Sequence, residues 1–159
     1  MSYFEINNLR IDHHSFEGTK TVLDIEHLAI EKGETYGLVG ESGQGKTVLA
    51  LAVQKLLRCP PGSIESGEIL LDGQNLLELK EKQMQREIRG KKIAMIFQDP
   101  MSCLNPVFTV GTIMTDVIRQ QNKGMKKKQA QEQAKKLLEE VKLADAGSVM
   151  NKYPHQLSG

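Results

Sequence analysis

Long apolar runs, strong net charge and closely spaced cysteines are all missing from this chain of 159 residues. The longest apolar run, VLALAV, is far shorter than the roughly 20 residues of a membrane helix, so we expect no membrane span. The first residues, MSYFEINNLR, have neither a basic start nor an apolar core, which argues against a signal peptide. The formal net charge is +1 and no basic stripe is visible, so nothing indicates a nucleic acid partner.

Metal and redox motifs are also missing. Cys59 and Cys103 lie far apart and form no C-x-x-C motif, which predicts free thiols in a reducing compartment. The histidines form no H-x-x-x-H spacing, and no Ser–His–Asp arrangement can be argued. We therefore expect a soluble, cytoplasmic chain whose histidines belong to the surface or to local structure: His13, His14, His27 and His155.

One glycine-rich stretch does carry chemistry. Residues 40–47 read GESGQGKT, which is the P-loop pattern G-x-x-x-x-G-K-[ST]. The preceding TYGLV (35–39) predicts a short buried strand, and the apolar spacing of 47–57 predicts a helix. Backbone N–H groups between a strand and a helix can converge on one anion. A glycine-rich turn that binds nothing is the alternative, but the flanking strand and helix favour a phosphate site.

Two side chains of this loop have expected roles. Lys46 would place a positive charge on the β- and γ-phosphates of a nucleotide, and Thr47 would offer a hydroxyl to Mg²⁺.

The rest of the chain alternates between strand and helix patterns. Short strands are expected within residues 3–30, with a turn at Glu17-Gly18, and the later pattern becomes mostly helical. This order predicts an α/β nucleotide domain with a helical insertion. The further predicted elements are a strand at 66–74, a helix at 76–90, a buried strand at 91–98 and helical structure over 111–142.

Two more motifs point to a family. FQDPMSCLNPVFTVG (97–111) follows a predicted strand, and YPHQLSG (153–159) ends the chain. Together with GESGQGKT, they resemble the ATP-binding subunits of ABC transporters, in particular the oligopeptide/dipeptide import branch. The resemblance implies a P-loop NTPase fold, truncated here, with an antiparallel β subdomain plus P-loop core (1–100) and a Q-loop plus helical subdomain (101–159).

The resemblance also assigns roles to residues. Gln98 would act with Lys46 in catalysis and, with Thr47, hold Mg²⁺, while Phe16 would stack on adenine. Ser158 and Gly159 match the start of the signature motif, which contacts the γ-phosphate of ATP on a partner subunit. Gln44 stands where the family has Ser and is expected to offer mainly its backbone. The remaining expected ATP contacts are Gly40, Glu41, Ser42, Gly43, Gln44, Gly45, Lys46, Thr47 and Val48.

Partners follow from the same resemblance. Asp99 to Pro106 would meet transmembrane permease subunits, with a structural loop as the alternative. A second ATP-binding subunit would complete the site, a substrate-binding protein would act indirectly, and the chain would lie on the cytoplasmic face of the cell membrane.

The 159 residues stop inside the signature motif. The family's Walker B Asp, catalytic Glu and switch His are not among them, so we expect nucleotide binding without meaningful hydrolysis from this stretch alone, and an ATPase in the full-length parent. Two other functions stay open at this point: a non-transport ABC-type ATPase of DNA repair or translation, and a nucleotide-binding fragment without activity.

Overall fold

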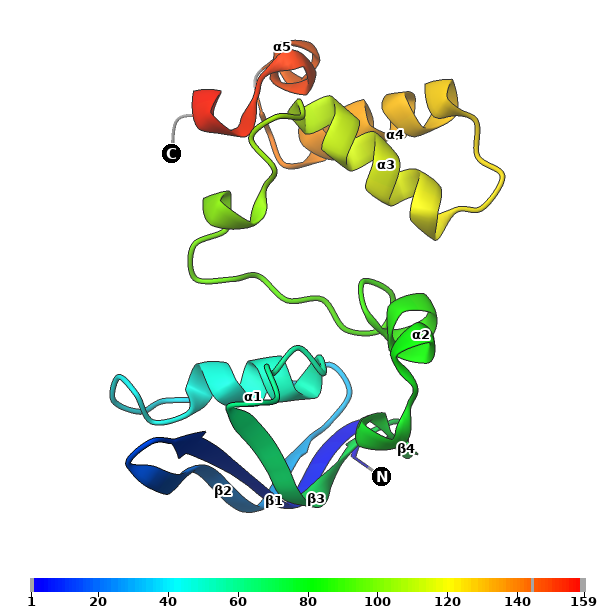
Figure 1. Cartoon of the computed structure of the whole chain (residues 1–159). Coiled ribbons are helices and arrows are strands. Elements are labelled where there is room, and N and C mark those ends of the chain that lie inside the picture. Colours follow the sequence, from blue (N-terminus) through cyan, green and yellow to red (C-terminus); the bar gives the residue numbers. More distant parts are fainter. Residues whose placement is uncertain (1, 144, 158–159) are drawn as a thin grey trace. The chain divides into compact units, whose positions relative to one another are not determined.

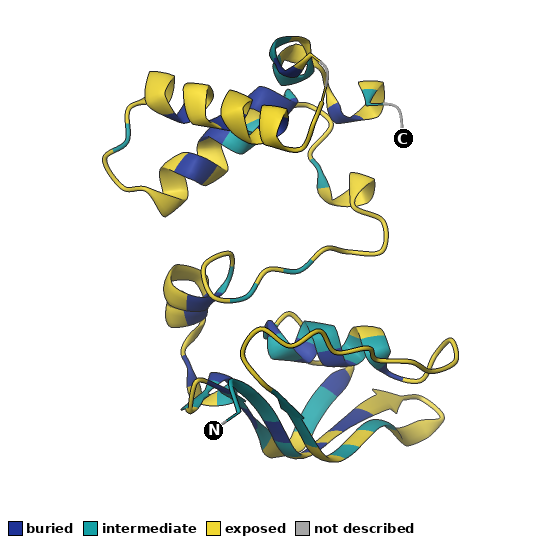
Figure 2. Ribbon diagram, turned by 180° about the vertical axis from the view of Figure 1, so that it is seen from behind, coloured by how far each residue is buried: buried dark blue, intermediate teal, exposed yellow. Residues whose placement is uncertain are grey.

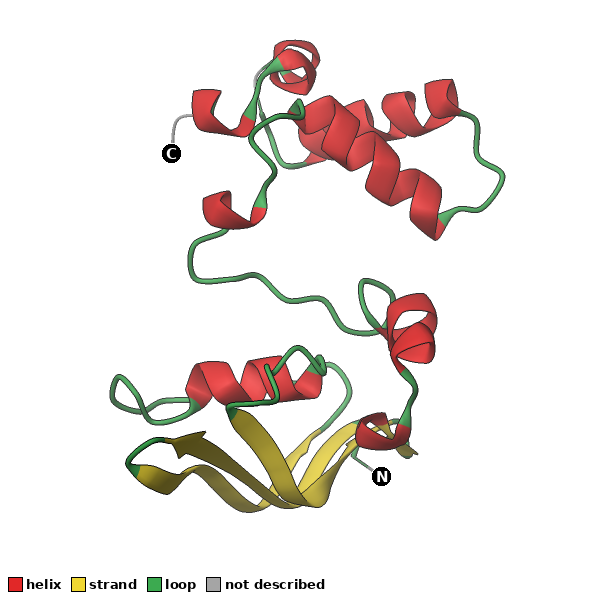
Figure 3. Ribbon diagram, in the orientation of Figure 1, coloured by secondary structure: helices red, strands yellow, loops and turns green. Residues whose placement is uncertain are grey.

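The computed structural model describes residues 2–143 and 145–157. The chain divides into two units, Met1–Met95 and Ile96–Gly159, and each is described by itself. The first unit contains an antiparallel sheet with strand order β2-β1-β3-β4, and helix α1 (Lys46–Val53) lies over one face of it (Figures 1 and 3). The strands are β1 (Phe4–Ser15), β2 (Gly18–Ile30), β3 (Gly62–Leu71) and β4 (Gln74–Asn75).

Strand β1 is the centre of this sheet and pairs with β2 on one side and β3 on the other. It is continuous where short separate strands were expected, because a bulge at Asn8, with φ of 49°, keeps both Ile6 and Leu9 turned inward. Gly67 of β3 faces this bulge, and a Cβ on it would come within 2.5 Å of the Asn8 carbonyl oxygen. Only glycine therefore fits at position 67, where β3 lies against the bulge of β1.

The core of the first unit lies between the sheet and α1 (Figure 2). Ile6, Leu9 and Ile11 of β1 are fully buried, and they meet Leu49 and Ala52 of α1. Burying apolar side chains of this size stabilises by about 1.5–3 kcal/mol each, so these contacts seat α1 on the sheet.

Residues 76–90 do not form the single helix that the sequence predicts. Leu79 and Lys80 are extended, with ψ of 138° and 152°, and break the segment. This break lets Leu76 and Leu79 pack in the same core as Met84, so tertiary burial outweighs local helix propensity. The segment consists of η1 (Leu76–Glu78), α2 (Glu81–Gln83) and η2 (Met84–Ile88).

The two buried strands predicted at 35–39 and 91–98 are absent from the described structure. Residues 35–39 have no regular secondary structure, and within 91–98 only Ile93 forms a bridge, to Arg89. A buried parallel strand needs hydrogen-bonding neighbours. No described segment supplies them, and Val39 and Ile96 are 95% and 89% exposed. The sequence correctly predicts apolar character at these two segments, but the strand prediction is wrong for this structure.

The second unit is helical, as predicted for residues 111–142. It is built on α3 (Val110–Gln121), α4 (Lys127–Glu140) and α5 (Ala146–Asn151), with short turns η3 (Met101–Cys103) and η4 (Pro154–Gln156). Ile118, Ala130 and Ala134 form its small core. Gly111 lets α3 approach α5, because a Cβ there would lie 2.6 Å from the Met150 carbonyl oxygen. Across the described residues, we find no helix with the length and apolar character needed to cross a membrane.

Arg89 ties the end of α1 to the segment that follows β4. Its Nε donates to the Gln54 carbonyl at 2.7 Å and its Nη2 donates to the Lys55 carbonyl at 2.9 Å. The same guanidinium pairs with Glu81 at 2.5 Å, and its side chain is 18% exposed. Arg89 thus satisfies carbonyls that the helix end leaves open.

We predict that Arg89→Met lowers the free energy of unfolding by about 1.5–3 kcal/mol, because hydrogen bonds from a charged donor are lost. Urea unfolding followed by far-UV circular dichroism measures this change. Arg86→Met is the matched control, since Arg86 is exposed on the same segment and should change stability by less than about 0.5 kcal/mol. Equal effects of the two substitutions would contradict the role of Arg89.

Candidate functional site

The glycine-rich segment 40–47 forms a tight loop that leads directly into α1. Gly43 and Gly45 have φ of 85° and 80°, in the left-handed region that side chains rarely adopt. Gly45 is the N-cap of α1, and no side-chain hydrogen bond caps this end of the helix. The first N–H groups of α1 are therefore available to an anion held by the loop.

Lys46 folds its side chain back over this loop. Its Nζ donates to the carbonyl oxygens of Gly40 at 2.6 Å and Glu41 at 2.5 Å. Gln44 braces the same turn, because its Oε1 accepts from the Glu41 N–H at 2.9 Å. Gln44 therefore contributes its side chain as well as its backbone. One turn thus gathers a cation and backbone donors, the combination that binds phosphate.

The loop is pressed against strand β2 at one point. A Cβ on Gly45 would lie 2.6 Å from the Val22 carbonyl oxygen and 3.1 Å from Leu23 Cδ1. Gly45 is buried, unlike the rest of the 40–45 segment. The absence of a side chain at Gly45 is what allows the loop to rest on the sheet.

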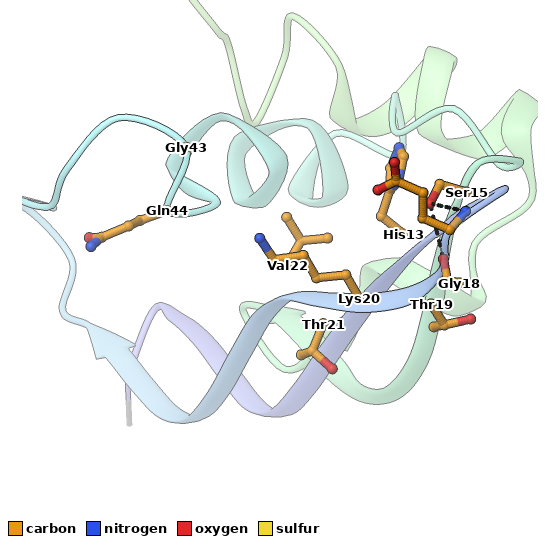
Figure 4. A pocket seen from close by; sticks show the side chains of 10 residues that line it. His13, Ser15, Gly18, Thr19, Lys20, Thr21, Val22, Gly43 and Gln44 are labelled. Carbon is orange, nitrogen blue, oxygen red and sulfur yellow. Dashed lines mark hydrogen bonds between the residues drawn. The ribbon is translucent and has the colours of Figure 1, made fainter.

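A cavity of about 660 Å³ opens between this loop and the β1–β2 hairpin (Figure 4). Gly43 and Gln44 line it on the loop side, and hairpin residues line the rest. Its volume lies in the range of sites for drug-sized ligands and cofactors. The hairpin residues are His13, Ser15, Glu17, Gly18, Thr19, Lys20, Thr21 and Val22.

The hairpin is also braced by an ion pair beside the cavity. Arg10 Nε donates to Asp12 Oδ1 at 3.2 Å, and Arg10 Nη2 donates to Thr21 Oγ1 at 3.0 Å. The hydrogen bond from Arg10, followed by one from Thr21, lowers the pKa of the Asp12 carboxyl below its ordinary value. The same contact with Asp12 raises the pKa of Arg10. Asp12 therefore stays a carboxylate that ties β1 to β2.

Within the first unit, the structure brings together the predicted residues of the loop but does not bring Phe16 into the lining of the cavity. Thr47 and Val48 follow Lys46 in the first turn of α1, with Thr47 exposed. Phe16 lies at the tip of the β1–β2 hairpin with its side chain fully exposed, and it does not line the cavity, although both of its neighbours do.

Three other predicted residues do not belong to the first unit. Gln98 is an exposed residue of the second unit, and its catalytic and metal-binding role stays a prediction. Ser158 and Gly159 lie outside the described residues.

Sequence reasoning missed the wall that the hairpin contributes. His13 and Lys20 are paired across β1 and β2 and both line the cavity, yet they belong to no motif. The alternation of side chains along β2 was the one pattern that could have shown which hairpin residues face the loop. A bulge at Val22 interrupts that alternation, so the sequence pattern alone does not place Lys20 on the cavity side.

Comparison with known proteins places this chain in a family. Residues 23–159 match the family model described as "ABC transporter". This chain belongs to the ABC transporter family. Its structure is similar to the dimeric structure of MJ0796, described as a bacterial ABC transporter cassette. The TM-score is 0.81 at 24% sequence identity, over 98% of this chain and 63% of that one. This likeness confirms the predicted fold class, an ABC-type nucleotide-binding domain with an antiparallel sheet and a helical part.

Curated relatives within the ABC family are named for peptide transport or glutathione import. The oligopeptide transport ATP-binding protein OppD of Bacillus subtilis (strain 168) is 41% identical over 98% of this chain and 43% of its own length. The probable D,D-dipeptide transport ATP-binding protein DdpD of Escherichia coli (strain K12) is 43% identical over 98% of this chain and 47% of its own length. The glutathione import ATP-binding protein GsiA of Salmonella typhimurium is 40% identical over 92% of this chain and 24% of its own length. The chain thus spans less than half the length of these relatives.

We predict that Gly45→Ala destabilises this ABC-type domain more than Gly43→Ala does. Both glycines have left-handed φ, which costs a side chain about 1–2 kcal/mol. Only at Gly45 would the new Cβ also collide with backbone, since nothing lies within 4 Å of a Cβ on Gly43. Urea midpoints of the two variants measure the difference. A Gly45→Ala variant as stable as Gly43→Ala would show that the loop does not depend on this close approach.

Proposed function

We propose that this chain binds ATP as the nucleotide-binding part of an ABC importer for peptides. The observation that carries the proposal is the loop at 40–47. There the Lys46 ammonium, glycine backbone and the start of α1 meet beside a cavity of about 660 Å³. The names of the relatives, which include oligopeptide and dipeptide transport, support a peptide cargo.

The expected chemistry is hydrolysis of the γ-phosphate in the full-length protein. Water attacks the γ-phosphorus as the bond to the bridging oxygen of ADP breaks, and negative charge spreads over the phosphate oxygens. In this proposal, Lys46 exchanges the carbonyls of Gly40 and Glu41 for the terminal phosphates and stabilises that charge. Gln98 orients the attacking water.

Mg²⁺ fits the oxygen donors that this chain offers. The Thr47 hydroxyl is exposed in the first turn of α1, directly after Lys46, and Gln98 adds an amide oxygen. Mg²⁺ prefers oxygen ligands, and when bound it would neutralise charge on the phosphates.

The proposed partners are permease subunits and a second ATP-binding subunit. The segment from Asp99 to Pro106 is held by a hydrogen bond from Ser102 Oγ to the Asp99 carbonyl at 2.8 Å. Met101 within it and Val107 directly after it are exposed apolar residues, which suits contact with another subunit. The dimer formed by MJ0796 supports a second cassette. A peripheral position on the cytoplasmic face of the membrane follows from this assignment.

A transport role is favoured over a non-transport ATPase of DNA repair or translation, because the relatives above are named as transport or import proteins. That residues 1–159 by themselves release phosphate only near background stays a prediction.

We predict that Lys46→Ala weakens Mg-ATP binding at least tenfold, because a charge-assisted contact to phosphate is lost. Isothermal titration calorimetry on the full chain measures the Kd. Lys32→Ala is the matched control, since Lys32 is exposed in the turn after β2 and does not line the cavity. The proposal is wrong if the Lys46→Ala variant binds Mg-ATP as tightly as the Lys32→Ala variant.

Phe16 provides a second test. If its ring stacks on adenine, Phe16→Ala should cost about 1–3 kcal/mol of ATP binding and Phe16→Tyr should cost little. Phe108→Ala is the control, because Phe108 is also an exposed aromatic but lies in the second unit. Unchanged affinity in Phe16→Ala would mean that adenine is held by another residue.

A further inference from the structure

The β1–β2 hairpin turns a lysine toward the cavity through an irregularity in β2. Ile11 pairs with Leu23 and Asp12 pairs with Thr21, so Val22 is an extra residue in β2. Side chains normally alternate along a strand, and residues three apart point to opposite faces. Because of the bulge, Lys20 and Leu23 share a face although they are three residues apart.

That face is the one covered by α1. Ile11 is buried in the core beneath the helix, Leu23 packs against that core, and His13 follows two positions after Ile11 on the same strand. His13 is paired with Lys20, and both residues line the cavity beside the glycine-rich loop. Figure 4 shows the Lys20 side chain extending into the cavity beside Val22, while the Thr21 side chain points to the other face of the strand.

Lys20 lies on β2 a short distance from the point where the glycine-rich loop contacts that strand. Val22 marks the loop, because its carbonyl oxygen would lie 2.6 Å from a Cβ on Gly45. Lys20 is two residues nearer the hairpin tip, about 7 Å along the strand. Consider a nucleotide with its terminal phosphates on the loop and its base toward the hairpin. Its α-phosphate would then lie close to Lys20.

The charges around Lys20 leave its ammonium available. In the described part of the chain, the Lys20 ammonium makes no side-chain hydrogen bond and no ion pair. Glu17 is the one carboxylate among the residues that line the cavity, and Lys46 is engaged with loop carbonyls. An ammonium that faces a cavity is a ready partner for a phosphate oxygen.

We propose that Lys20 is a second phosphate-binding cation of this site, which contacts the α-phosphate of the nucleotide bound on the loop. The inference rests on the proposed function and deepens it: Lys46 holds the terminal phosphates, and Lys20 holds the phosphate next to the ribose. The bulge at Val22 is the device that aims Lys20 into the cavity.

Two ligands of different length test this assignment on the full chain. Mg-ATP spans both lysines, whereas magnesium pyrophosphate fills only the terminal positions on the loop. Lys20→Met should weaken Mg-ATP binding about five- to tenfold and leave pyrophosphate binding unchanged, because a partly exposed charge contact is lost. Lys46→Ala should weaken both ligands, and Lys20→Arg should retain most of the affinity for Mg-ATP.

Lys32→Met is the control for net charge, and far-UV circular dichroism of each variant confirms that the sheet is intact. The inference is overturned if Lys20→Met binds Mg-ATP like Lys32→Met. It is also overturned if Lys20→Met weakens ATP and pyrophosphate equally, since Lys20 would then act by general charge. A wild-type chain that binds neither ligand refutes the proposed function itself, and the inference with it.

Discussion

The contact between Gly45 and the backbone of β2 holds the site together. A buried glycine in a left-handed conformation lets the loop rest on the Val22 carbonyl, closer than any side chain would permit. The same residue starts α1, so the contact sets where the helix begins and where its free N–H groups lie. On the sheet side, Val22 is the extra residue of a bulge. One close approach therefore positions the loop, the helix and the hairpin wall together.

Seating α1 on the sheet requires a second attachment at its other end. The Arg89 guanidinium satisfies the carbonyls of Gln54 and Lys55 and pairs with Glu81. Between these two attachments, Leu49 and Ala52 bury against β1. A short helix of this length is marginal by itself in water, so its stability comes from these tertiary contacts.

The apolar segments at 35–39 and 91–98 have the composition of strands but do not belong to the sheet. Their composition is that of buried parallel strands, yet Val39 and Ile96 face solvent in the described structure. An apolar strand gains its stability from hydrogen bonds and packing on both sides. Within the described part of the chain, no residues pair with these segments to form a sheet.

The sequence by itself indicated a phosphate-binding loop, because glycine, lysine and threonine in P-loop spacing have few other uses before a helix, and the structure does place 40–47 directly before α1. It also predicted the helical structure of 111–142, from the change of apolar period along the chain. Local pattern could not decide the break at Leu79 and Lys80, because burial in a shared core outweighs helix propensity there. Nor could it decide that Lys20 faces the cavity. A one-residue bulge reverses every side chain beyond it, and only the pairing of β1 with β2 shows where that bulge lies.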